Sequence, residues 1–151
     1  MNRYERLCRE IRRVLGNGMP SDFSGFGAVI YRGALTDFQT SPLVQDSLVT
    51  PPINRDAEIA SLLISLSRYS DIRHDGFHFI HQGDGLISLS LFVSPPIPAN
   101  YIPTYYGVGA RHRSAELISM MGTIEAVVIV EKSGDIRAFV NGQSRVVSHE
   151  E

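Results

Sequence analysis

The sequence predicts an α/β (α+β) fold, a single domain in which a central mixed β-sheet is flanked by helices. Its 151 residues are about the size of one domain. Apolar residues repeat with helical spacing in some segments and form short continuous runs, bounded by glycine or proline, in others. We see no second core and no internal repeat. Helical and strand segments interspersed in this way pack as layers around one sheet.

The first predicted element is an amphipathic helix over residues 3–15, ended by two glycines and a proline. Its polar face could lie on a membrane surface or against a partner, but we interpret it as a solvated face over a packed stripe. We therefore expect an N-terminal amphipathic helix over 1–20, ahead of a domain over 21–151. The polar face carries Arg3, Arg6, Arg9, Glu10 and Arg13.

The later elements are predicted from apolar runs, helical spacing and turn residues. Residues 32–57 are rich in Pro, Thr, Ser and Asp, and we expect one long loop there. A stiff loop rich in proline and tyrosine is expected over 94–106. The predicted strands are Gly25–Tyr31, Phe77–His81, Leu86–Val93, Glu125–Glu131 and Asp135–Val140, and the further predicted helices are 57–69 and 110–121.

Composition narrows the classes of protein. A net charge of -2 argues against a protein that coats nucleic acid, although a local basic pocket is compatible with it. The single cysteine, Cys8, excludes an intramolecular disulfide and lies among apolar helical positions, where a packed thiol is expected. No apolar run reaches the roughly 18–20 residues that span a bilayer, and no signal-peptide pattern is present. We expect a cytoplasmic protein.

The stretch Gly109-Ala110-Arg111-His112-Arg113 opens a predicted helix with basic residues. The first turn of a helix carries unpaired N–H groups and a partial positive charge, so it ordinarily favours acidic residues. Arginines placed there fit a bound anion, and phosphate is the natural one because arginine grips it bidentately. They could equally pair with carboxylates elsewhere or point into water.

A second stretch, His74-Asp75-Gly76, comes just before a predicted strand. The aspartate could bind a divalent cation or take a proton from a hydroxyl, and glycine lets a ligand approach the backbone closely. An ordinary Asp-Gly turn is the other interpretation. A zinc site is not expected, because His78 and His81 point to opposite faces of a strand and no cysteine lies nearby.

Together these two stretches resemble the paired signatures of the diadenylate cyclase domain family, DAC. That family has an Asp-Gly-Ala motif, often preceded by histidine, and later a Gly-Thr-Arg-His-Arg motif that opens a helix. The resemblance extends from about Gly25 to Gly142 and includes the closing strand, turn and strand over 127–136. It implies synthesis of cyclic di-AMP from two ATP molecules. The alternative is a catalytically inactive nucleotide-binding module of the same fold.

The resemblance also implies roles for individual residues. Asp75 would act on the ribose 3′-hydroxyl that attacks the α-phosphate of a second ATP, and His74 and Asp75 would hold Mg²⁺ or Mn²⁺. One site holds one ATP, so a homodimer or higher homo-oligomer with facing sites is expected. The residues implied to bind the nucleotide are Gly76, Phe77, Ala110, Arg111, His112, Arg113 and Glu131.

Two positions depart from the family pattern. Phe77 replaces the small residue after Asp-Gly, and its ring could stack on adenine or narrow the pocket. Ala110 replaces a threonine and removes one hydroxyl. A lost hydrogen bond costs roughly 0.5–1.5 kcal/mol, which weakens binding by about tenfold at most.

Overall fold

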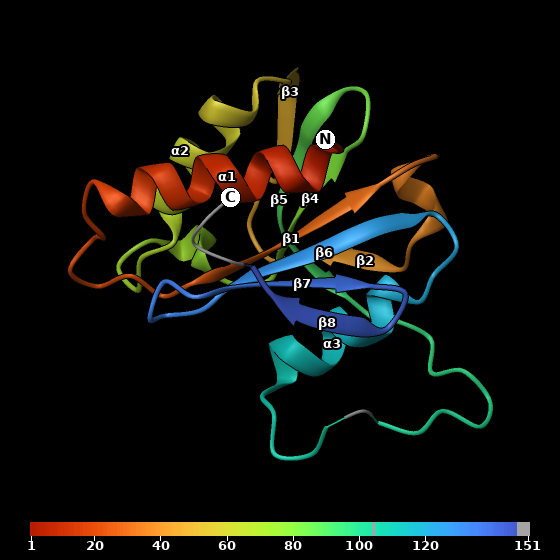
Figure 1. Cartoon of the computed structure of the whole chain (residues 1–151). Coiled ribbons are helices and arrows are strands. Elements are labelled where there is room, and N and C mark those ends of the chain that lie inside the picture. The colour runs from red at the N-terminus through yellow and green to blue at the C-terminus, as the bar shows by residue number, and fades with distance from the viewer. Residues whose placement is uncertain (104, 148–151) are drawn as a thin grey trace.

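The computed structural model describes residues 1–103 and 105–147 and confirms the predicted fold class, a mixed sheet with helices on both faces (Figure 1). Position 104, in the predicted 94–106 loop, and the end of the predicted 21–151 domain lie outside the described residues. The helices are α1 (Arg3–Gly16), α2 (Asp56–Leu66) and α3 (Ala110–Ser119), with the short 3-10 helices η1 (Leu35–Asp37) and η2 (Ile72–His74). The strands are β1 (Phe26–Tyr31), β2 (Thr40–Pro42), β3 (Leu48–Ile53), β4 (Phe77–His81), β5 (Gly85–Val93), β6 (Ile124–Val130), β7 (Ile136–Val140) and β8 (Gln143–Val146).

The first strand of the chain, β1, lies near the middle of the sheet. Within the described residues the strand order is β2-β5-β4-β1-β6-β7-β8, and β3 also pairs with β5. β1 and β4 run parallel, and the other paired strands are antiparallel. The predicted hairpin is confirmed as β4 and β5.

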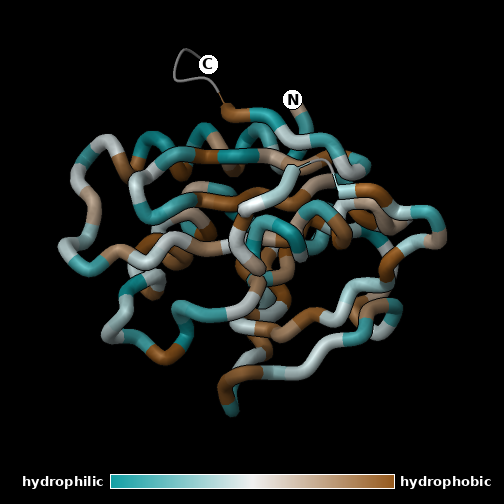
Figure 2. Tube along the Cα trace, turned by 90° about the horizontal axis from the view of Figure 1, so that it is seen from below, coloured by the Kyte–Doolittle hydropathy of each residue, from teal (hydrophilic) through white to brown (hydrophobic). Residues whose placement is uncertain are grey.

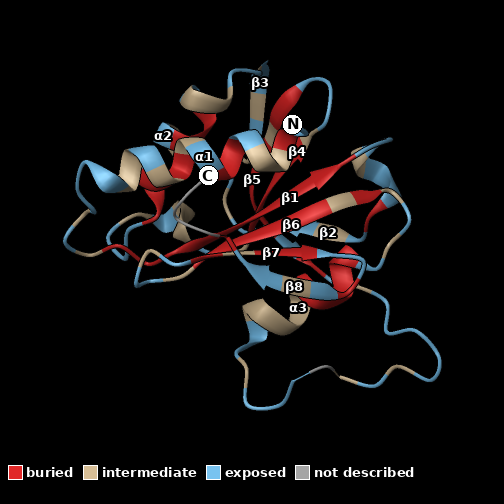
Figure 3. Cartoon of the chain, in the orientation of Figure 1, coloured by how far each residue is buried: buried red, intermediate tan, exposed pale blue. Residues whose placement is uncertain are grey.

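The sheet separates two apolar cores. α1 and α2 cover one face, and α3 covers the other (Figure 1). β1 and β6 lie between these layers and are almost wholly buried (Figure 3), which explains why their sequences are continuous apolar runs without alternation. In Figure 2, seen from below, brown apolar segments run through the middle of the trace. Because β1 and β6 are buried along almost their whole length, the polar residues that follow them in the sequence lie at the ends of the sheet.

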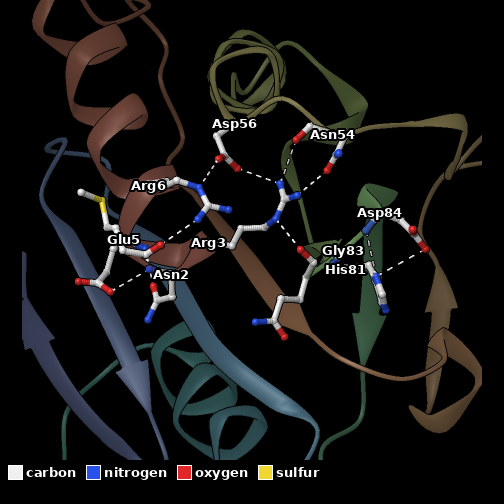
Figure 4. A network of polar contacts seen from close by, with 11 residues as sticks. Asn2, Arg3, Glu5, Arg6, Asn54, Asp56, His81, Gly83 and Asp84 are labelled. Carbon is white, nitrogen blue, oxygen red and sulfur yellow. Dashed lines mark hydrogen bonds and ion pairs between the residues drawn. The ribbon is translucent and has the colours of Figure 1, made fainter.

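The N-terminal helix α1 is built into the first core through Leu7, Cys8 and Ile11. The expectation that its polar face is solvated is wrong for Arg3, whose side chain is only 5% exposed. The Arg3 guanidinium donates to Asn54, to the Gln82 carbonyl and to Asp56, joining α1 to the start of α2 and to the β4–β5 turn (Figure 4). A buried guanidinium needs such partners, and five donors in a fixed fork can serve several acceptors at once.

The expectation of one long loop over 32–57 is also wrong, because the segment contains η1, β2 and β3. Both strands pair with β5 at the border of the sheet and leave most of their side chains exposed. Edge strands are stabilised by ladder hydrogen bonds more than by burial, and they tolerate proline, so their sequences carry no apolar signal. β8 lies at the opposite border of the sheet and was not predicted from the sequence, for the same reason. None of the described helices is both long and apolar enough to cross a membrane.

Candidate functional site

The two sequence motifs come together at one edge of the sheet, the edge formed by the ends of the central strands β1, β4 and β6. β1 and β4 are parallel with Gly27 opposite Phe77, so the residues just before both strands lie at the same edge. β6 is antiparallel to β1 with Phe26 opposite Val130, so the residue that follows β6, Glu131, lies at this edge as well. The topology therefore places Asp75 and Glu131 at one end of the central strands.

A cavity of about 440 Å³ opens at this edge between the start of α3 and the turn after β6. Its volume is in the range of small-molecule sites, about 300–1,000 Å³. It is lined by Val108, Gly109, Arg111, His112, Ile129, Val130, Glu131, Lys132 and Arg137. Three of the predicted nucleotide-binding residues, Arg111, His112 and Glu131, thus share one cavity, which we call the Arg111 cavity.

Arg111 connects this cavity to the His74-Asp75-Gly76 stretch. Burial lowers the pKa of Arg111, while the nearby Asp75 carboxylate and Tyr69 raise it. Within the described part of the chain, no hydrogen bond or ion pair of 4.0 Å or less engages its guanidinium. The first turn of α3 has neither a side-chain cap nor an acidic residue. A partly buried cation beside uncapped N–H groups is a favourable place for an anion.

His112 is held as a neutral ring. It lies edge-on to Phe139, with ring centroids 4.8 Å apart, and to Tyr105 at 6.4 Å. Burial and then the charge on Arg137 lower the pKa of His112, although nearby glutamates oppose this. At neutral pH the imidazole is therefore uncharged and can serve a ligand as one donor or one acceptor.

Arg113 differs from Arg111 in being fully engaged. Its guanidinium donates to the Tyr101 hydroxyl at 3.0 Å and to the Tyr105 carbonyl, and it lies 3.8 Å from the Glu116 carboxylate. The Tyr101 hydroxyl donates in turn to Glu116 at 2.8 Å. Of the interpretations left open by the sequence, pairing with a carboxylate therefore holds for Arg113. Whether it also reaches a nucleotide stays a prediction.

Glu131 belongs to the tight turn between β6 and β7. Its N–H donates to the Asp135 carbonyl at 2.8 Å, and its carboxylate lies 3.9 Å from Arg137 Nε. Arg137 therefore offsets the one carboxylate that lines the cavity. Within the described residues Arg111 and Lys132 remain as cations without such an ion pair, so the cavity is positively charged in a chain whose net charge is -2.

His74 and Asp75 were predicted to hold a divalent metal. The His74 Nδ1 lies 2.7 Å from the Asp71 carbonyl, which can only accept, so Nδ1 carries the proton and the Nε2 lone pair is free to bind a metal. Asp75 is exposed at the end of η2. The described residues contain no group of three or more histidine, cysteine or acidic side chains that could hold a metal by themselves. Two protein ligands fit Mg²⁺ bound mainly through substrate phosphates and water.

Gly76 and Phe77 have clear structural reasons to be where they are. Gly76 has a φ of +76°, and a Cβ there would lie 2.7 Å from the Leu91 carbonyl oxygen, so only glycine fits. The Phe77 ring is buried in the second core over Gly27, where a Cβ on Gly27 would lie 2.6 Å from it. Neither residue lines the Arg111 cavity as described. Ala110 is exposed at the first position of α3.

Three residues of the site were not predicted from the sequence. Lys132 and Arg137 line the cavity, and Tyr69 lies against both His74 and Lys132. Only Lys132 had a usable signal, since it directly follows Glu131 at the end of a predicted strand. Tyr69 comes from a turn after α2, and nothing in the sequence places that turn beside β6.

The family comparison agrees with this geometry. The model of the DAC family, described as DisA bacterial checkpoint controller nucleotide-binding, matches residues 26–144. The chain belongs to the DAC family. The match includes both motifs and Glu131, and it begins at β1, leaving α1 outside.

Two solved structures share the fold of this DAC protein. DacA from Staphylococcus aureus, solved as a double cysteine mutant, has a TM-score of 0.64 and 22% identity, over 97% of this chain and 87% of that one. A protein from Bacillus cereus described as a hypothetical membrane spanning protein has a TM-score of 0.63 and 19% identity, over 96% of this chain. The DAC protein spans only 63% of that second chain. No curated protein matches the sequence.

Proposed function

We propose that this DAC protein synthesises cyclic di-AMP from two ATP molecules. The observation that carries the proposal is that Asp75 and Glu131 lie at the same end of the central strands, beside a cavity that Glu131 lines together with Arg111 and His112. Membership of the DAC family, whose model is described as nucleotide-binding, supports it. A catalytically inactive nucleotide-binding module is the alternative, and it differs in forming no product.

The proposed chemistry consists of two nucleotidyl transfers. In each, the 3′-oxygen of one ATP attacks the α-phosphorus of the other, and the bond from that phosphorus to the pyrophosphate oxygen breaks. Asp75 takes the 3′-hydroxyl proton, and pyrophosphate leaves. Because Asp75 is exposed, its carboxylate is accessible to a ribose hydroxyl.

The remaining residues position the phosphates. Arg111 and the uncapped N–H groups of α3 would bind phosphate oxygens, and neutral His112 would add a single hydrogen bond. Arg113 would hold the loop before α3 in place through Tyr101 and Tyr105. A divalent cation held by His74 and Asp75 would neutralise charge on the phosphates.

Two ATP molecules must meet, so we propose that two copies of the protein face each other at these sites. Exposed apolar side chains lie next to the site, with Tyr69 56% and Ile72 78% exposed. Apolar surface of this kind at the border of a site suits contact with a second copy.

The test is incubation of the purified protein with ATP and Mg²⁺ or Mn²⁺, followed by chromatography for cyclic di-AMP and pyrophosphate. Both products should form, and activity per protomer should rise with protein concentration as dimers form. Binding of ATP without any cyclic product would favour the inactive module. Absence of ATP binding would contradict both functions.

A further inference from the structure

Lys132 is the only lysine among the 14 basic residues of the chain. It is exposed, lies two residues after the end of β6 and lines the Arg111 cavity. Its Nζ lies over the Tyr69 ring, 5.4 Å from the ring centroid. No carboxylate of the described residues forms an ion pair with it. Within the described residues Lys132 therefore has no ion-pair partner, and its ammonium lies near an aromatic ring.

Tyr69 can hold this position because its own turn is anchored. Its N–H donates to the Asp22 carbonyl at 3.1 Å. The Asp22 carboxylate accepts from Ser70 Oγ at 2.8 Å and from Arg68 Nε. The hydrogen bond from Arg68 lowers the pKa of Asp22, so this anchor is charged at neutral pH.

The same N-terminal segment also fixes the backbone of Lys132. Gly25, which has a φ of +73°, packs so closely that a Cβ on it would lie 2.4 Å from the Val130 carbonyl oxygen and 3.1 Å from the Lys132 nitrogen. Residues 22–25 thus contact the Tyr69 turn on one side and the end of β6 on the other. This segment therefore fixes the Tyr69 turn and the Lys132 backbone relative to each other.

We propose that Lys132, held by Tyr69, is a second phosphate-binding residue that gives the site its preference for nucleoside polyphosphates. The inference rests on the proposed nucleotide function and adds a residue to that site. Arg111 is partly buried in the cavity wall, whereas the Lys132 side chain is exposed and its charge is available to an entering anion. A lysine is a mobile point charge and can follow a polyphosphate chain, for which a rigid guanidinium is less suited. Tyr69 also contacts His74, with ring centroids 5.5 Å apart, so the lysine lies on the side of the predicted metal ligand.

The experiment measures the affinity of adenosine, AMP, ADP and ATP, without turnover, for the wild type and for Lys132→Gln. A charged hydrogen bond corresponds to roughly tenfold or more in affinity, so Lys132→Gln should weaken the affinity for ATP by about that factor and leave the affinity for adenosine unchanged. Lys132→Arg keeps the charge and should keep most of the ATP affinity. Arg55→Gln is the matched control, because it removes one charge from a side chain that is 79% exposed and, among the described residues, paired only with Glu58.

The single lysine also provides a direct probe. Reductive methylation with ¹³C-formaldehyde preserves its charge and gives one lysine signal besides that of the N-terminal amine. ATP should shift this signal, and adenosine should not. If the wild type binds ATP, and Lys132→Gln binds it equally well or loses affinity equally for adenosine, the lysine role is refuted while the nucleotide function stands. If the wild type binds no nucleotide, both are refuted.

Discussion

Replacing Arg111 and Arg113 one at a time should separate nucleotide binding from stability, although the two residues are only one position apart. Arg111→Gln removes a cation that has no hydrogen-bond or ion-pair partner in the described residues. Arg113→Gln removes the donor of the bonds to Tyr101 and Tyr105 and the cation next to Glu116.

The structure gives the expected magnitudes. The Glu116 side chain is 5% exposed, so losing its cationic neighbour together with two hydrogen bonds should cost about 1.5–3 kcal/mol of unfolding free energy. For Arg111→Gln, relief of repulsion at the N-terminus of α3 should leave stability unchanged or raise it by about 0.3–1 kcal/mol. The same change should weaken the binding of ATP by about 1.5–3 kcal/mol, the scale of a charged hydrogen bond.

Thermal unfolding with and without ATP measures both effects in one assay. At a concentration of about 100 times the dissociation constant, ATP should stabilise the wild type by about 2.7 kcal/mol, and a tenfold weaker site reduces this to about 1.4 kcal/mol. We expect the reduced ATP shift in Arg111→Gln and the lowered melting temperature of the free protein in Arg113→Gln. A destabilised Arg111→Gln with a normal ATP shift would refute the anion-site reasoning.

Three further predictions concern the fold. Burial lowers the pKa of His78 from 6.5 to about 3, so on acidification the unfolded chain binds the proton at a higher pH than the folded protein does. The contribution to unfolding free energy should therefore be complete above pH 6.5 and fall by about 1.4 kcal/mol per pH unit below it. Urea unfolding of His78→Asn at several pH values should show a shallower fall. Gly27→Ala should destabilise by about 1–3 kcal/mol through contact with the Phe77 ring, and adding Phe77→Ala should recover part of that loss in a double-mutant cycle. Arg3→Ala should cost about 3 kcal/mol in urea unfolding, because it leaves Asn54 and Asp56 with fewer partners, whereas an exposed control, Arg13→Ala, should change little.

The sequence was sufficient for the elements that apolar residues define. β1, β4, β5 and β6 are buried between helical layers, and their apolar runs predicted them to within about one residue. β2, β3 and β8 could not be found this way, because they border the sheet and expose most of their side chains. The buried position of Arg3 depends on partners from two distant segments, the start of α2 and the β4–β5 turn, which no local pattern reveals.

The site shows the same division. The basic start of α3 and the stretch around Asp75 were identified from unusual local chemistry. The pairing of β1 with β4 and β6 places Asp75 and Glu131 at one edge, and α3 brings Arg111 and His112 to the cavity that Glu131 lines. The difference between Arg111 and Arg113 depends on where Tyr101 and Glu116 lie in space. Phe77 could not be placed from the sequence, which allowed its ring to stack on adenine or to narrow the pocket. In the structure the ring is buried in the second core, in the space over Gly27 that a side chain would otherwise fill.

The central claim, that Asp75 acts on the reacting hydroxyl, is tested most directly by comparing cyclic di-AMP formation by the wild type and Asp75→Asn at saturating ATP and Mg²⁺ or Mn²⁺. A catalytic base contributes about 10²–10⁴-fold to rate, so Asp75→Asn should lose cyclic di-AMP formation by at least that factor and still bind ATP. The exposed position of Asp75 means that the substitution should leave the fold intact, which the melting temperature checks. Equal rates of cyclic di-AMP formation by the wild type and Asp75→Asn would contradict the account.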